Sequence, residues 1–507
     1  MHSMNSTSKA SLKRNILANY AGQGWASLMG IAFIPVYIRY LGMEAYGVIG
    51  LFAVMQIWLT LLDIGMTPTL NREMARYSAG AHSAESIRNL VRTLEIVCIV
   101  IAVVIALALW LCSDWLAMHW LNAHSLPLSD ITHALSIMGF VAALRFVEGL
   151  YRGAVLGLQK QVWLNAVTSL LATGRGLGAV GVLAWVSPTI QGFFIWQLLI
   201  SALTLAIFAI AVHRALPGSG RRARFSLEAI AGVRKFAGGM FLTTLLALLL
   251  TQVDKVLLSR ILSLESFGVY AFASSVAGVL FQLIGPISQA YFPRFTELTE
   301  KGDRYKVAVA YHEGAQLMSI MLVPAGLILI AFGEQLLAGW TGDEVLARQA
   351  APLVAVLAVG TILNGWMHIP YMLQLANGWS ALAVRVNIVA AVVLVPAIFW
   401  VTPRYGPIGA AWIWVIVNAG YILVAVHFMH RRLLPMEKWS WYVRDLFLPS
   451  ASAGVVVWIS ALAHPSGLHV VPEFLWATAT GALALAAAVL GSSEYKRRVR
   501  QLWIGLR

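Results

Sequence analysis

Apolar segments about as long as a lipid bilayer is thick recur along the whole chain of 507 residues. A helix needs about 20 predominantly apolar residues to cross the hydrocarbon core. Backbone polar groups in that core must be satisfied within the protein, so a chain of this kind folds as a bundle of membrane-spanning helices. Fourteen segments qualify, at 15–39, 46–65, 92–113, 131–151, 163–186, 190–212, 236–259, 267–290, 309–332, 351–373, 381–401, 408–429, 444–463 and 472–490.

Composition excludes a soluble fold. Hydrophobic residues make up 59% of the chain and charged residues 11%, against about a quarter charged in soluble domains. A soluble protein of this size could not bury so much apolar surface. A polar stretch, residues 1–14, precedes an apolar run of about 25 residues that lacks the short core and small-residue cleavage site of a signal peptide. We therefore expect the first segment to remain as a membrane span.

The basic residues predict how the chain is threaded, because loops on the cytoplasmic side carry an excess of Lys and Arg. If the amino terminus is cytoplasmic, the inside segments hold 29 Lys and Arg residues, and the outside loops hold only Arg39, Arg260, Arg348 and Arg404. We therefore predict that both termini are cytoplasmic. The net charge of +14 is then a property of the loops, and nucleic acid is not an expected partner because no basic soluble domain is present to bind it.

An internal repeat predicts the architecture. Residues 39–48, RYLGMEAYGV, match residues 260–269, RILSLESFGV, with five identities. The matched segments join spans 1 to 2 and 7 to 8, so each repeat holds six spans and both copies have the same orientation. The predicted parts are an N-tail at 1–14, an N-lobe at 15–212, a basic linker at 213–235, a C-lobe at 236–430, spans 13 and 14 within 431–490, and a basic C-tail at 491–507.

Three segments carry a resemblance to a known family. They are NILANYAGQGWASLMGIAFIPVYIRYLGMEAYGVIGLFAV near the start, QVDKVLLSRILSLESFGVYAFASSVAGVL, and YGPIGAAWIWVIVNAG. Together they resemble polysaccharide flippases of the Wzx type, in the multidrug/oligosaccharidyl-lipid/polysaccharide exporter superfamily.

The resemblance implies two six-helix bundles that alternate between inward-open and outward-open states in the bacterial inner membrane. It also implies a cargo of undecaprenyl-diphosphate-linked oligosaccharide for O-antigen, capsule or exopolysaccharide synthesis, and a polysaccharide polymerase as a candidate partner. By analogy with lipid II flippases, spans 13 and 14 would form a groove for the lipid tail.

Arg175 is the most informative charge inside a predicted span, because an intramembrane arginine usually faces a cavity or a partner. It lies near the middle of span 5 within Gly174–Gly178. The glycines would let a bulky anion or another helix approach the backbone. A guanidinium fork also suits a diphosphate. The alternative is a structural arginine that caps carbonyl groups or pairs with an acid on another helix.

Span 4 carries a further group of charges, Arg145, Glu148 and Arg152. Arg145 and Glu148 are three residues apart, so they can pair on one helix face. Arg152 continues that face toward the cytoplasmic surface. The alternative to a self-neutralising pair is a cationic ladder that guides the headgroup of the cargo.

The acidic residues are the candidates for ion coupling or gating. Asp254 and Lys255 are neighbours on span 7 and point about 100° apart, so they are not expected to pair well. Asp254 is the candidate for proton or sodium coupling, or for a partner in the outer gate. Asp63, Glu95 and Glu313 lie near cytoplasmic ends, where a structural role is expected, with Glu313 as an alternative coupling residue. A proton gradient, a sodium gradient and removal of the cargo all remain open as energy sources.

No enzyme motif is found. The chain has no Walker loop for ATP, no His-Glu-x-x-His helix and no Cys/His cluster, so neither a metal nor a cofactor is expected. Two other functions remain as alternatives. A cation-coupled multidrug exporter of the same superfamily is disfavoured by a central arginine. A membrane glycosyltransferase or polymerase is disfavoured because the outside loops near 114–130 and 333–350 are short and poor in paired carboxylates.

Overall fold

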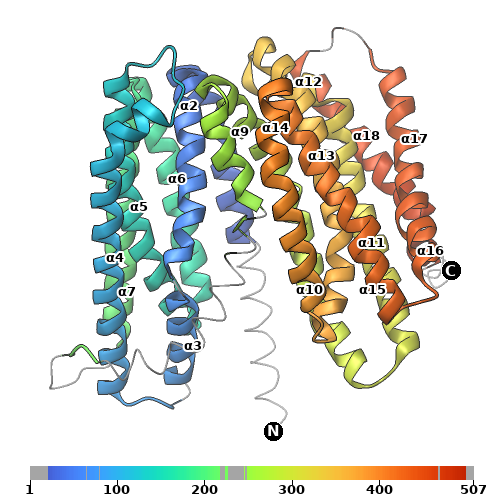
Figure 1. Cartoon of the computed structure of the whole chain (residues 1–507), viewed down its shortest axis with the longest axis horizontal. Helices are drawn as coiled ribbons and strands as arrows, with labels where there is room; N and C mark the ends of the chain where they lie inside the picture. Colours follow the sequence, from blue (N-terminus) through green and yellow to red (C-terminus); the bar gives the residue numbers. More distant parts are fainter. Residues whose placement is uncertain are drawn as a thin grey trace. The chain divides into compact units, whose positions relative to one another are not determined.

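The computed structural model describes residues 21–63, 65–78, 80–216, 223–226, 245, 248–249, 251–465, 467 and 469–497. Helices make up nearly all of these residues, and the one β-bridge in the described part joins Asn122 and Ser263. The chain divides into two compact units, Met1–Gly268 and Val269–Arg507, which are described separately below (Figure 1).

The first unit is a bundle of long helices with one short amphipathic helix at an end. Residues 21–32 are helical. They are followed by α2 (Ile34–Leu59), the short η1 (Thr60–Asp63), α3 (Met66–Ser78), α4 (Ala84–His119), α5 (Leu128–Gly157), α6 (Gln161–Trp185) and α7 (Ile190–Ala215). Side chains of α3, α4, α5 and α7 form a buried apolar core. Ser83 and Thr189 cap α4 and α7 by accepting hydrogen bonds from the free N–H groups of Ser86 and Gly192.

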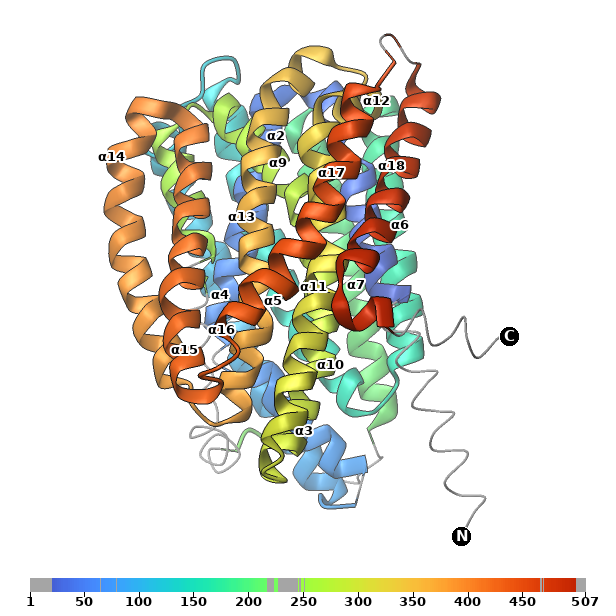
Figure 2. The same ribbon diagram turned by 90° about the vertical axis from the view of Figure 1, so that its right-hand side faces the viewer.

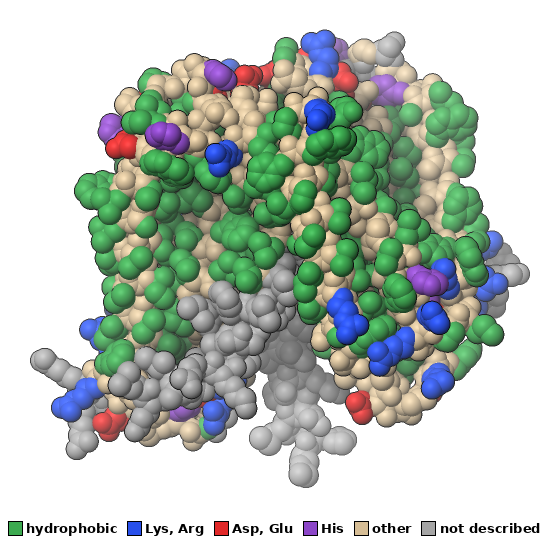
Figure 3. Space-filling model, in the orientation of Figure 1, with side chains coloured by type: hydrophobic (Ala, Val, Ile, Leu, Met, Phe, Trp, Pro, Cys, Tyr) green, Lys and Arg blue, Asp and Glu red, His purple; other side chains and the backbone are tan. Residues whose placement is uncertain are grey.

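The second unit packs its helices around α11 (Figure 2). Its elements are α9 (Leu264–Gly278, which begins at the end of the first unit), α10 (Phe281–Glu300), α11 (Arg304–Ala331), α12 (Gly333–Thr341), α13 (Glu344–Ala376), α14 (Ala381–Gly420), η2 (Tyr421–Ala425), α15 (Val426–Leu433), α16 (Lys438–Ser440), η3 (Trp441–Phe447), α17 (Leu448–Leu462) and α18 (Val470–Gly491). Apolar side chains cover the flanks of the helices and charged side chains gather at their ends (Figure 3).

Two glycines interrupt what would otherwise be continuous helices. Gly42 has φ 82° and Gly406 has φ 61°, a backbone region that glycine enters without a steric penalty. Around Gly406 the chain forms a hairpin. The guanidinium of Arg432 lies 4.3 Å from the ring of Trp379, so the two ends of the segment meet, and Figure 2 shows the ribbon turning back at the top of α14. Predicted spans 11 and 12 are thus the two arms of this hairpin.

The expected all-helical membrane fold is confirmed. By length and apolarity the described residues contain ten helices able to cross a membrane, or eleven if α9 and α10, bent by 41°, form one span. The hairpin Ala381–Leu433 is one of these ten helices, although it has two arms joined at Gly406. Predicted spans 1 and 7 lie partly outside the described residues, as do the tails and most of the linker at 213–235. The total of fourteen, the domain boundaries and the cytoplasmic termini therefore stay predictions.

The two copies of the repeat pack against each other within the first unit. A side chain at Gly47 would overlap the backbone oxygen of Leu264, and one at Gly268 would overlap that of Met43. These pairs occupy equivalent positions of the repeat, so the contact is reciprocal, as at a local two-fold axis. Small residues at such crossings let membrane helices approach closely. The amide of Leu264 also donates to the carbonyl of Asn122 at 2.8 Å.

Candidate functional site

The first unit holds two partly open cavities between its helices, each lined by apolar side chains and several polar ones. One, of about 320 Å³, is lined by residues that include Tyr37, Glu148, Arg152, Arg175 and Gln197. The other, of about 350 Å³, is lined by residues that include Gln56, Asp63, Thr67 and Arg145. The side chain of Gln197 links them, because it lines the first cavity and accepts a hydrogen bond of 2.9 Å from Arg145 Nη2. The structure thus brings together the three predicted arginines from α5 and α6.

Arg175 has spare hydrogen-bonding capacity. Its Nε is buried and has no hydrogen-bond partner among the described residues. The surrounding glycines admit aromatic rings: a side chain at Gly176 would overlap Phe33, and one at Gly178 would overlap Trp196. Trp196 also donates from Nε1 to the backbone oxygen of Arg175 at 3.1 Å. Of the two explanations for this glycine-rich stretch, the approach of another helix accounts for Gly176 and Gly178.

Arg145 does not pair with Glu148 along one helix face, in contrast to the prediction. Its guanidinium crosses to α7, where it donates to Gln197, and lies 5.1 Å from the ring of Phe52. Ser201 accepts a longer bond of 3.4 Å from its Nε. A buried guanidinium has five N–H donors to satisfy, and neighbours on another helix offer acceptors and an aromatic face that one carboxylate cannot supply.

The first cavity carries a net positive charge. Among the described residues, Arg152 and Arg175 line it together with a single acid, Glu148, and Arg152 is exposed to solvent. In the second cavity Asp63 accepts hydrogen bonds from the Thr67 amide at 3.0 Å and the Thr67 hydroxyl at 2.8 Å, so it caps the start of α3. The second cavity is thus lined by one carboxylate and one guanidinium, those of Asp63 and Arg145, and the excess of positive charge lies in the first cavity.

The other predicted acids have partners of their own. Lys255 Nζ lies 3.5 Å from Asp254 Oδ1, which corrects the expectation that these neighbours would not pair. The flexible lysine stem folds back and also reaches the carbonyl of Thr251 at 3.1 Å. Glu313, in the second unit, lies 3.2 Å from Arg294 Nη1. Neither Asp254 nor Glu313 lines either cavity.

Sequence reasoning missed a polar network inside the second unit. Asp445, which is fully buried, lies 2.5 Å from His312 Nδ1 and accepts a hydrogen bond of 2.8 Å from Gln316 Nε2. The other ring nitrogen of His312 lies 2.9 Å from Glu437 Oε2. The polar residues of α11 within an apolar segment could have indicated such a network. Their partners could not be identified from the sequence because they lie more than 100 positions away. The partners of Glu44 were also missed: it accepts hydrogen bonds from the amides of residues 124–126, which lie 80 to 82 positions away.

Two family models match the chain. One, described as "Polysaccharide biosynthesis protein", matches residues 12–299, and the other, MatE, matches residues 240–400. The Shigella flexneri protein named "Putative O-antigen transporter" is 20% identical over 404 residues, covering 80% of this chain and 94% of that protein. The "Succinoglycan biosynthesis transport protein ExoT" of Rhizobium meliloti is 23% identical, covering 78% of this chain and 79% of that protein.

Solved structures share the fold. The lipid II flippase MurJ in an inward closed conformation aligns with a TM-score of 0.71 at 12% identity, over 96% of this chain and 99% of that one. An inward-facing multidrug resistance MATE transporter aligns with a TM-score of 0.63 at 14% identity, over 83% and 96% of the two chains. At these identities the similarity defines the fold alone.

The fold and its long apolar helices define a multi-pass membrane protein. Because the first family model covers more than half of the residues, the chain belongs to the family of polysaccharide biosynthesis proteins.

Proposed function

We propose that this protein is a flippase that moves a lipid-linked oligosaccharide across the bacterial inner membrane for surface polysaccharide synthesis. The observation that carries the proposal is the cationic cavity between apolar helices long enough to span a membrane, in a member of the polysaccharide biosynthesis family. The names of relatives that transport O-antigen and succinoglycan units support this cargo class. No group in this proposal acts as a catalyst.

The chemistry of the cavity suits a phosphorylated headgroup. In the proposal, the guanidinium of Arg175 forms charge-assisted hydrogen bonds to the diphosphate, with Nε, which is buried without a partner among the described residues, as one of the donors. Arg152, at the exposed edge, attracts the anion, and Arg145 contributes positive potential while Gln197 holds it in place. The polyprenyl tail remains in lipid, and the two units alternate between inward-open and outward-open states.

Asp254 and Glu313 stay candidates for ion coupling or gating in this proposal. Each is held by a basic partner, Lys255 and Arg294 respectively. An ion that neutralised either carboxylate would release that partner, which is the kind of local change that biases a two-state transporter.

A cation-coupled drug exporter is the second candidate, favoured by the MatE match over 240–400. Lipophilic cations prefer acidic cavities, and the cavity of this chain has two arginines and one glutamate. Export of cationic dyes by cells that express the protein, without any effect on surface polysaccharide, would favour this candidate.

The test replaces Arg175 with Ala and with Lys in a host that lacks its own flippase and measures surface polymer. Loss of charge-assisted bonds to the diphosphate is expected to reduce polymer by roughly ten-fold or more in the alanine variant. The lysine variant keeps the charge but loses the fork, so an intermediate level is expected.

Arg348→Ala is the matched control. Arg348 is an exposed arginine of the second unit and does not line either cavity. Membrane levels of all variants are measured by immunoblot. Wild-type polymer with both Arg175 variants at normal expression would remove Arg175 from the mechanism.

A further inference from the structure

We propose that a groove in the second unit, separate from the cavity for the cargo, binds an anionic phospholipid of the cytoplasmic leaflet. The groove has a volume of about 890 Å³ and lies between the two arms of the hairpin around Gly406. Sites for small ligands typically measure about 300–1,000 Å³. The proposal does not depend on which cargo is transported.

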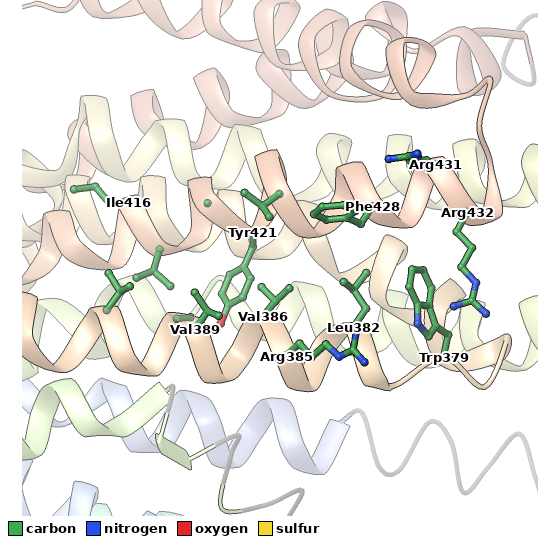
Figure 4. Close-up of a pocket in the computed structure, with 15 residues that line it drawn as sticks. Trp379, Leu382, Arg385, Val386, Val389, Ile416, Tyr421, Phe428, Arg431 and Arg432 are labelled. Carbon is green, nitrogen blue, oxygen red and sulfur yellow. The ribbon is translucent and has the colours of Figure 1, made fainter.

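The walls of the groove are apolar along most of its length. Figure 4 shows Val386 and Val389 on the first arm facing Ile416, Tyr421 and Phe428 on the second. Val389 and Ile416 are 62% and 64% exposed although both lie within membrane-spanning arms. Such side chains are stable only against hydrocarbon, so acyl chains are the expected neighbours of these walls.

One end of the groove is cationic. Arg385, Arg431 and Arg432 line this end, and the described residues that line the groove include no acid. Among the described residues none of the three arginines forms an ion pair, and Arg432 stacks over Trp379. Guanidinium groups without a carboxylate partner are suited to bind phosphate oxygens. Basic pockets between membrane helices are known sites for lipid phosphates.

The charge distribution of the second unit assigns this end to the cytoplasmic side. Of the basic residues that the structure describes in this unit, only Arg348 and Arg404 lie at the far end of the helices. The basic residues at the near end are Arg294, Lys301, Arg304, Lys306, Arg385, Arg431, Arg432, Lys438, Arg444, Lys496 and Arg497. The excess of positive charge marks the cytoplasmic face, where the leaflet carries anionic lipids. Trp379 and Trp439 at the same end fit the interfacial position of a headgroup.

The backbone of the second arm forms a wider helical turn where Tyr421 and Val424 line the groove. Residues Tyr421–Ala425 form a π-helical turn, a feature often found at functional sites. The Tyr442 hydroxyl donates to the carbonyl of Ile422 at 3.0 Å, which stabilises this turn. Tyr421 and Gly420 line the groove, and the missing side chain at Gly420 leaves space beside the tyrosine ring.

Native mass spectrometry of the delipidated full chain in detergent tests the proposal. Phosphatidylglycerol and phosphatidylcholine with the same acyl chains are titrated separately. We expect tighter binding of phosphatidylglycerol, weakened about five-fold per arginine removed, or about 25-fold in Arg385→Ala/Arg432→Ala. Val389→Trp, which fills the groove and keeps the arginines, is expected to abolish the specific complex, so the test holds even if the double alanine variant fails to fold.

Arg404→Ala is the matched control. Arg404 stacks on Trp400 at 4.5 Å at the other end of the same hairpin, much as Arg432 stacks on Trp379. It should bind phosphatidylglycerol as the wild type does. Equal affinity for the two phospholipids, an equal loss in Arg404→Ala, or full binding by Val389→Trp would overturn the proposal. Displacement of phosphatidylglycerol by a polyprenyl diphosphate at one-to-one stoichiometry would also overturn it, because the groove would then hold the cargo tail.

Discussion

Asp445 is expected to be one of the most sensitive positions for stability. The carboxylate is fully buried in the π-helical segment η3 and contacts His312 and Gln316 of α11. Both nitrogens of His312 face carboxylates, those of Asp445 and Glu437. A neutral imidazole has only one N–H, so this arrangement holds an additional proton on the ring or on a carboxyl group.

The substitution Asp445→Ala removes the central acceptor of this network. Removing one partner of a buried charged pair costs about 3–5 kcal/mol, because the remaining groups stay buried without compensation. For a unit of this size such a loss lowers the melting temperature by on the order of 10 °C. Asp445→Asn keeps the shape and one acceptor oxygen, so a smaller decrease is expected.

The assay is thermal unfolding of the detergent-solubilised protein, followed by tryptophan fluorescence and by size-exclusion chromatography of heated samples. Glu344→Ala is the control, since Glu344 forms only an exposed ion pair with Arg348 at 4.0 Å, worth about 0–1 kcal/mol. If Asp445→Ala melts at the same temperature as Glu344→Ala, the network does not hold α11 and η3 together and the reasoning fails.

Two further predictions concern the first unit. Gly47→Val places a side chain against the backbone of Leu264, and this overpacking should lower the free energy of unfolding by about 1–3 kcal/mol. The control Gly24→Ala has open space around the new side chain and should melt like the wild type. A wild-type melting temperature for Gly47→Val would contradict the reciprocal contact. Burial raises the pKa of Glu73 in the short helix α3, but hydrogen bonds from His82 and Arg72 and the charges of Arg76 and Arg72 outweigh burial, so its pKa lies below the usual 4.5. The ionised Glu73 therefore stabilises the fold fully above pH 4.5, and this stabilisation is lost as the pH falls through the lower folded-state pKa. Glu73→Gln should remove that part of the acid sensitivity in melting curves measured from pH 7 to pH 3.5. An acid profile of Glu73→Gln identical to that of the wild type would refute this prediction.

Much of the fold follows from local properties of the sequence, which do not depend on contacts between distant segments. The length and apolarity of each segment decide whether it can cross a bilayer, because lipid is the solvent. The connections expected between spans 1 and 2 and between spans 11 and 12 contain Gly42 and Gly406, where φ is positive and the helices break. The repeat at 39–48 and 260–269 also identified two segments that meet in the structure, since Gly47 packs on Leu264 and Gly268 packs on Met43.

The partners of Arg145 and Asp445 were decided only by tertiary structure. One residue along a helix rotates the side chain by about 100°, and the depth and rotation of each helix in the bundle set which residues meet. Arg145 therefore turns to Gln197, 52 positions away, and not to Glu148 on its own helix. In the same way, Asp445 meets His312 across 133 positions. The sequence by itself thus determined that the helices are surrounded by lipid, where the apolar segments lie, and how Lys and Arg are distributed among the loops. The packing of helix on helix determined the cavity, the buried network and the groove.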